Sequence, residues 1–134
     1  MNLSVPAELL DEMFDHAKTI YPQEACGFLV GHGTLATRFM SLPNILQSET
    51  AYEIDPAILA STFRSLRESS EELVAIFHSH PSGPAEPSKT DLQRAFYPEA
   101  AHVIVSLADQ ERPEIRAFRI IDGRAYEVEL HAIV

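Results

Sequence analysis

The segment from residue 78 to residue 91, HSHPSGPAEPSKTD, contains the side chains best suited to chemistry. His78 and His80 end an apolar run, and alternate residues of a strand face the same way, so both rings can converge on one point. Asp91 follows after one proline-rich loop and can reach the same point. Two imidazoles and one carboxylate form a familiar catalytic zinc site that leaves a fourth position for water. The pattern therefore predicts a metal centre.

Each part of this pattern also has a purely structural interpretation. An H-x-H pair alone often marks polar residues at the end of a strand. Ser88-x-x-Asp91 matches a capping box at the start of a helix, and taken alone it favours the cap. The two roles are compatible, because Ser88 can cap the helix while it faces the site. The joint spacing, H-x-H followed by seven residues and then S-x-x-D, is what favours a metal site.

The elements that position these residues can be predicted from hydrophobic periodicity and turn residues. Ser4 is expected to cap a first helix that Pro22 ends, and Asp55-Pro56 is expected to start a second helix. Asp122-Gly123 predicts a hairpin turn. The predicted helices cover 5–20, 56–66 and 88–96, and the predicted strands cover 25–31, 35–42, 73–77, 101–107, 114–121 and 124–133. Residues 43–51 and the stretch PSGPAEPSKT, residues 81–90, are predicted loops, the second overlapping the start of the third helix. We therefore expect one α/β domain over residues 1–134, with a mixed sheet and about three helices.

Composition excludes several other classes of protein. The chain has 134 residues, of which 46% are hydrophobic, so it can bury an ordinary core. A net charge of -10 without a basic stripe argues against nucleic-acid binding. The N-terminal residues do not resemble a signal peptide and no apolar run is long enough for a membrane span, so a cytoplasmic location is expected. Homo-oligomerisation is left open.

Other reactive side chains are given structural roles. Cys26, the one cysteine, lies in an apolar run and is expected to be a buried thiol rather than a nucleophile. Ser79 should point away from the histidines and serve as a supporting hydrogen-bonding group. His102 could lie next to the site, although a simple position at the start of a strand is favoured.

The motif H-S-H-P-x(6)-S-x-x-D, with Glu-Ala-Cys-Gly-Phe-Leu upstream, resembles the JAMM/MPN+ zinc metallopeptidases, especially their small prokaryotic members. The resemblance implies an MPN domain, whose fold is similar to that of cytidine deaminases. It also implies one Zn²⁺ per chain, with His78, His80 and Asp91 as its ligands. Glu24 resembles the family's acid/base residue, which works on the zinc-bound water without binding metal. Ser88 matches the serine that hydrogen-bonds near the water and the tetrahedral intermediate.

The resemblance also implies a substrate: a peptide or isopeptide bond after the C-terminal Gly-Gly of a ubiquitin-like or sulfur-carrier protein. Two alternatives stay open. One is a protein like those of the RadC family, which share a similar H-x-H-P-S-G segment. The other is a zinc-bound MPN interaction module that needs a partner for activity. A zinc deaminase is excluded, because its P-C-x-x-C pattern needs more than one cysteine.

Overall fold

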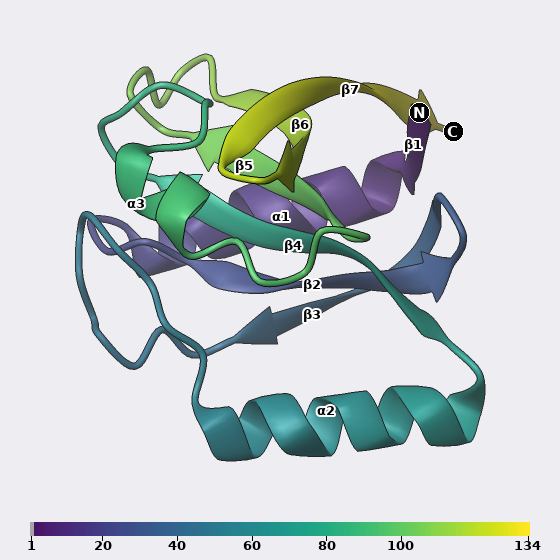
Figure 1. Cartoon of the computed structure of the whole chain (residues 1–134). Helices are drawn as coiled ribbons and strands as arrows, with labels where there is room; N and C mark the ends of the chain where they lie inside the picture. Colours follow the sequence, from purple (N-terminus) through teal and green to yellow (C-terminus); the bar gives the residue numbers. More distant parts are fainter. Residues whose placement is uncertain (1) are drawn as a thin grey trace.

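The computed structural model describes residues 2–134 and shows a β-sheet packed between helices (Figure 1). In chain order the elements are β1 (Asn2–Pro6), α1 (Ala7–Ile20), β2 (Cys26–His32), β3 (Leu35–Leu42), α2 (Pro56–Ser69), β4 (Glu72–His80), α3 (Lys89–Gln93), β5 (Ala101–Ser106), β6 (Glu114–Ile121) and β7 (Arg124–Ile133). Every predicted helix and strand is present within a few residues of its expected range. Within residues 2–134, none of the helices has the length and apolar character that a membrane crossing needs.

The strands form one mixed sheet in the order β1-β3-β2-β4-β5-β6-β7, which closes into a barrel. β4 runs parallel to β5, whereas β2 pairs antiparallel with both β3 and β4. The barrel is closed by β1, which pairs in parallel with β7 on one side. On its other side β1 pairs with β3 through a single residue pair, Ser4 with Leu35. The predicted hairpin joins β6 to β7, and Asp122 (φ 51°) and Gly123 (φ 74°) both take the left-handed conformation that such a turn needs. The mixed sheet and the hairpin are confirmed.

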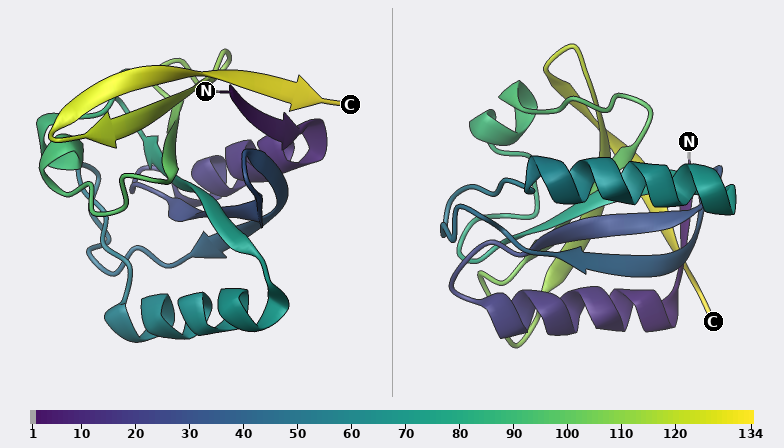
Figure 2. Two further views of the ribbon diagram at one scale, coloured as in Figure 1. Left: turned by 45° about the vertical axis from the view of Figure 1, so that its right-hand side comes forward. Right: turned by 90° about the horizontal axis from the view of Figure 1, so that it is seen from below.

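Two hydrophobic cores lie on opposite faces of β2 and β4. Phe77 belongs to one core together with Met13 of α1. The preceding residue, Ile76, points to the opposite face and belongs to the second core together with Leu66 of α2. Figure 2 shows α1 and α2 on opposite sides of these strands. Because strand residues alternate, His78 and His80 lie on the α2 side of the sheet. The packing of β4 thus decides which way both rings face.

Two glycines of β2 let β3 approach closely. A Cβ atom added at Gly27 would collide with the main-chain oxygen of Met40, and one added at Gly31 would collide with that of Leu35. Any side chain at either position would therefore push the two strands apart. The glycines of the ACGFLVG run are explained by this strand pairing.

Two local predictions are wrong. Ser4 does not cap a helix: it lies in β1, where its N–H donates to the main-chain oxygen of Thr34, and Pro6 occupies the N-cap position of α1 without a side-chain bond. The pairing of β1 with distant strands overrides the local capping signal. α3 ends at Gln93 rather than near Phe96, and Phe96 is 73% exposed.

Candidate active site

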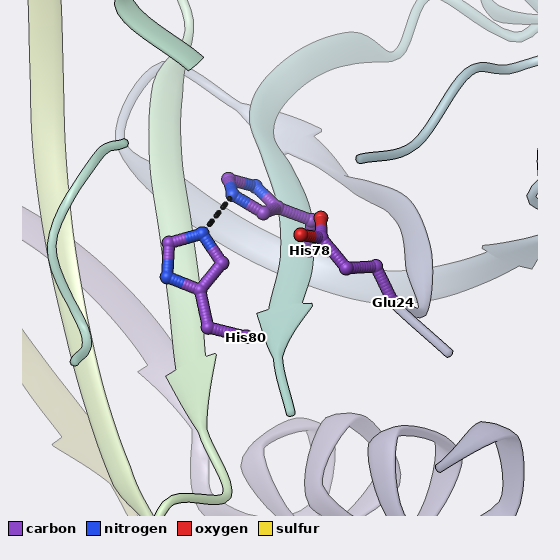
Figure 3. Close-up of side chains that lie close together, drawn as sticks. All are labelled: Glu24, His78 and His80. Carbon is purple, nitrogen blue, oxygen red and sulfur yellow. Dashed lines mark hydrogen bonds between the residues drawn. The ribbon is translucent and has the colours of Figure 1, made fainter. Parts of the chain in front are cut away.

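β4 ends in the two predicted histidines, His78 and His80, which are 1% and 7% exposed. Their Nε2 atoms lie 3.1 Å apart. Figure 3 shows the two rings facing each other, with the side chain of Glu24 extending toward them from the segment before β2. Side chains from two distant parts of the sequence therefore meet at the end of this strand.

The start of α3 brings Asp91 to the histidines. Its Oδ2 atom lies 3.0 Å from the Nε2 atom of His78 and 3.0 Å from that of His80. The same oxygen accepts a hydrogen bond from the Ser88 N–H at 2.9 Å, and Ser88 Oγ accepts one from the Asp91 N–H at 3.1 Å. The predicted capping box is thus present, and it points the carboxylate of Asp91 at the two rings.

A hydrogen bond from the proline-rich loop orients His80. Its Nδ1 atom lies 2.8 Å from the main-chain oxygen of Pro84, which can only accept, so Nδ1 carries the proton. In the neutral ring, the lone pair is then on Nε2, the atom that faces His78 and Asp91. The loop is itself anchored to β5, since the hydroxyl of Ser106 donates to the Gly83 oxygen at 2.6 Å. This arrangement is typical of metal-binding histidines, whose second nitrogen is fixed by a neighbouring acceptor.

Aromatic stacking orients His78. The ring of Tyr52, from the loop before α2, lies nearly parallel to the imidazole, with ring centroids 4.7 Å apart and an interplanar angle of 25°. Burial lowers the pKa of His78 and favours its neutral form. His102 on the neighbouring strand β5 is also buried, and burial followed by the proximity of His78 lowers the pKa of His102 to about 4. Both rings are therefore neutral at physiological pH.

Asp91 supplies the negative charge of the cluster. Burial opposes its ionisation, but the hydrogen bonds with His78 and His80 outweigh burial and hold the pKa of Asp91 well below its usual range. For His80, burial acts to lower the pKa, but the hydrogen bonds with Asp91 and with the Pro84 oxygen, together with the nearby carboxylate charges, raise the pKa of that ring. The cluster thus presents one carboxylate and two imidazole nitrogens to a single point, which is the donor set that a divalent cation prefers.

The distances fit a tetrahedral metal site. Zinc binds histidine nitrogen and carboxylate oxygen at about 2.0–2.2 Å, so neighbouring ligand atoms in a tetrahedron lie about 3.3 Å apart. The three contacts among His78, His80 and Asp91 are 3.0, 3.0 and 3.1 Å. Glu24 forms a second group with the two histidines, in which all ligand atoms lie within 4.8 Å of one another. Either carboxylate can complete the pair of histidines, and Asp91 is the one that lies within hydrogen-bonding distance of both rings.

Glu24 is buried, at 3% exposure, and its Oε1 atom has no hydrogen-bond partner within residues 2–134. Burial raises the pKa of Glu24 to about 7, with His80 opposing this shift and Asp91 adding to it. A carboxylate whose pKa lies near neutrality can both take up and release a proton at physiological pH. The position is therefore suited to acid/base chemistry, which the residue type alone could not indicate.

A model of the family described as prokaryotic homologs of the JAB domain matches residues 6–121. This chain is a member of the Prok-JAB family. The CysO-cysteine peptidase of Mycobacterium tuberculosis is 35% identical over 133 residues, which cover 98% of this chain and 91% of the relative. The desampylase of Haloferax volcanii is 32% identical over 111 residues, which cover 78% of this chain and 80% of the relative.

Solved structures agree on the fold. A protein from Desulfitobacterium hafniense has a TM-score of 0.87 and 31% identity, covering 98% of this chain and 92% of its own. A JAB1/MPN domain protein from Archaeoglobus fulgidus has a TM-score of 0.62 and 22% identity, covering 98% of this chain and 99% of its own. The expected MPN-type fold is confirmed, as is the resemblance to small prokaryotic family members.

The remaining reactive residues of this Prok-JAB domain support the structure. Cys26 is fully buried, and burial, followed by the proximity of Glu24, raises the pKa of its thiol to about 12, so it is no nucleophile. Ser79 faces away from the histidines, as predicted, and its Oγ accepts a hydrogen bond from the Ala25 N–H at 2.8 Å. The position of Ser79 ties the segment after Glu24 to β4.

Two pockets meet at the cluster. One, of about 330 Å³, lies between α2 and α3 and has apolar walls such as Ile54 and Ile76, with Asp91 and Arg94 on its α3 side. The other, of about 280 Å³, is lined by Glu24, His80 and Ser88 and by the proline-rich loop. Because His80 and Asp91 are in contact, the two pockets adjoin the same cluster of side chains.

Sequence reasoning missed three residues that shape the site. Tyr52 stacks on His78, Ser106 anchors the loop that orients His80, and Asn44 hydrogen-bonds the main chain of Glu24. Tyr52 lies shortly before Asp55-Pro56, which was interpreted from sequence only as a helix start. Ser106 and Asn44 act through main-chain groups, so neither shows a recognisable motif.

Proposed function

We propose that this protein is a zinc-dependent peptidase or isopeptidase that cleaves after the C-terminal Gly-Gly of a ubiquitin-like or sulfur-carrier protein. The observation that carries this proposal is the convergence of His78, His80 and Asp91 on one point, with the buried carboxylate of Glu24 beside it. Membership of the Prok-JAB family and the names of the relatives, CysO-cysteine peptidase and desampylase, support the same conclusion.

His78, His80 and Asp91 would hold one zinc ion per chain, because their three facing atoms have tetrahedral spacing. When bound, zinc would lower the pKa of a water molecule toward neutrality and polarise the scissile carbonyl. The hydrogen bond from His80 to Pro84 keeps the Nε2 lone pair available, and the capping box holds the carboxylate of Asp91 in place. These two contacts preorganise the donor atoms before any ion binds.

Glu24 is the general acid/base. With its pKa near 7, its carboxylate accepts a proton from the attacking water and then delivers that proton to the nitrogen of the leaving amine. Oε1 of Glu24 has no hydrogen-bond partner within residues 2–134, whereas Oδ2 of Asp91 lies 3.0 Å from both rings. Glu24 is therefore assigned to proton transfer and Asp91 to metal binding.

Ser88 is proposed to do two things with one hydroxyl. Its oxygen accepts from the Asp91 N–H in the capping box, and its O–H proton stays available to donate to the oxyanion of the tetrahedral intermediate. It lines the same pocket as Glu24, so both groups can act on one scissile bond.

The two pockets suggest how the substrate lies. Glu24 lines the pocket walled by the proline-rich loop, so the leaving amine should depart there. The acyl side, the extended Gly-Gly tail, then lies toward the larger apolar pocket between α2 and α3. Glycine permits close approach of a backbone to the cluster, which folded loops with bulky side chains cannot achieve.

A cleavage assay on fusion proteins tests this function. A β-grasp protein ending in Gly-Gly and fused or conjugated to another group should be cut after the second glycine, as read by mass spectrometry. Matched substrates ending in Ala-Ala or Val-Val should be cut far more slowly, and Glu24→Gln should lose roughly 10²–10⁴ in rate while it keeps its zinc. Equal cutting of all three tails would contradict the assignment to Gly-Gly substrates. If the purified chain cuts none of them until a partner is added, the interaction-module alternative is correct.

A further inference from the structure

Asn44 uses its whole hydrogen-bonding capacity on main-chain groups around the site. Its Nδ2 atom donates to the oxygens of Glu24 and Ala51, each at 3.0 Å. Its Oδ1 atom accepts from the N–H groups of Leu46 and Glu53, each at 3.1 Å. An asparagine amide offers two donor hydrogens and two acceptor lone pairs, so all four are satisfied. A side chain that makes all four hydrogen bonds to main-chain groups holds those main-chain segments in one arrangement.

The first consequence concerns Glu24. Its main-chain N–H donates to the Ser48 oxygen at 2.8 Å, and its main-chain oxygen accepts from Asn44. Both main-chain groups of Glu24 are thus held by the loop that follows β3. Its carboxylate, by contrast, has an Oε1 atom without a partner in the described residues 2–134. The place of the carboxylate is therefore set largely through the main chain that Asn44 and Ser48 hold.

The second consequence concerns the loop itself. Asn44 also hydrogen-bonds Ala51 and Glu53, farther along the same loop. These two residues lie on either side of Tyr52 in the sequence, and the ring of Tyr52 stacks on His78. One amide thus connects the segment that carries Glu24 with the segment that touches His78. Asn44 does not line either pocket, so it acts on the reaction centre through other residues.

We propose that Asn44 is a positioning residue that holds the Glu24 carboxylate beside the scissile bond. This inference rests on the proposed role of Glu24 as the general acid/base. It goes beyond the family motif, which contains no residue of this loop.

The test is a double-mutant cycle with Asn44→Asp and Glu24→Gln. The aspartate keeps the oxygen that accepts from Leu46 and Glu53 but loses both donated bonds, including the one to Glu24. On its own, Asn44→Asp should lower kcat by roughly 10–100-fold, since small displacements of a reacting group have effects of this size. KM for a Gly-Gly fusion and the zinc content should stay within about 2-fold of the wild type, because Asn44 itself lines neither pocket and contacts no proposed zinc ligand.

In the Glu24→Gln background, Asn44→Asp should lower the residual kcat by less than about 3-fold, because its effect passes through a group that is already disabled. Asn44→Ala, which introduces no charge, is measured beside it and should show the same lack of additivity. Asp55→Ala is the matched control at the end of the same loop: it removes a cap bond to the Ala57 N–H and should lower Tm with kcat unchanged.

Three outcomes would overturn the proposal. The first is the same fold-loss in both backgrounds, which would mean a general structural effect. The second is a wild-type kcat for Asn44→Asp. The third is failure of both Asn44 variants to fold, which would make Asn44 a residue of loop stability alone. A wild-type rate for Glu24→Gln by itself would instead contradict the proposed function, so the two failures can be told apart.

Discussion

The starts of α2 and α3 use similar capping chemistry for different ends. At α2, the Asp55 carboxylate accepts from the Ala57 N–H at 2.8 Å, and the helix that follows has 14 residues and buries Thr62 and Leu66. At α3, Ser88 accepts from the Asp91 N–H, but the helix has 5 residues and none of them is buried. The cap of α2 therefore stabilises a helix that packs on the core, whereas the cap of α3 has little helix to stabilise.

The difference teaches that the capping box at α3 fixes a side chain rather than a helix. In the second hydrogen bond of this capping box, the Ser88 N–H donates to Asp91 Oδ2. The same oxygen lies within hydrogen-bonding distance of both histidines. A capping motif seen in sequence cannot tell these two uses apart. What distinguishes them is the presence of a second set of partners for the carboxylate.

The largest expected effect is at Asp91. Asp91→Asn keeps the size of the side chain but removes the negative charge and one acceptor oxygen, so zinc binding and Gly-Gly cleavage should both be lost. Metal analysis of protein purified without chelator should give about one zinc per wild-type chain and almost none for the variant. Full zinc content in Asp91→Asn would mean that Glu24, and not Asp91, completes the site with the two histidines.

A smaller effect is expected at Ser88. Ser88→Ala should lower turnover by roughly 10²–10³-fold, the usual effect of losing one oxyanion donor. Ser88→Thr is the matched control, because threonine keeps both a capping oxygen and a hydroxyl donor. A Ser88→Ala protein that melts at a lower temperature and yet cleaves at the normal rate would leave Ser88 with the capping role only.

The smallest effect on catalysis is expected at Asp55. Asp55→Ala removes a cap of the same chemical kind and should cost about 0.5–2 kcal/mol of stability, measured by urea unfolding. Its turnover should match that of the wild type, because Asp55 lines neither pocket and has no contact with the cluster. If turnover fell along with stability, the conclusion that the α2 cap stabilises its helix without affecting the site would be wrong.

Residues that lie close together in sequence were predicted well, and residues joined by distant contacts were not. His78, His80, Ser88 and Asp91 fall on one strand, one loop and one helix start, so their spacing alone indicated convergence. Glu24 lies roughly fifty positions upstream of them, and only the family resemblance selected it among twenty acidic residues. Its burial and raised pKa depend on packing that no local pattern reveals.

The same limit explains the errors in the fold. Ser4 has the residue type of a helix cap, but β1 pairs with β7, whose residues are at the other end of the chain. α3 was predicted to continue to Phe96, yet it has no buried face to favour further turns, and it ends at Gln93. Asn44 could not be recognised, because its four partners are main-chain groups brought together only when the loop before α2 has folded.

The distribution of the site along the chain has a consequence for evolution. The three side chains that meet within 3.1 Å all come from residues 78–91, whereas Glu24, the proposed acid/base residue, comes from the separate segment before β2. Under the proposed assignment, residues 78–91 would hold the ion, whereas proton transfer would depend on the separate segment that contains Glu24. On this assignment, a descendant that changed position 24 alone would keep the fold and the ion-binding side chains while losing the proposed reaction, so one mutation would suffice to convert a hydrolase into a metal-bearing binding domain.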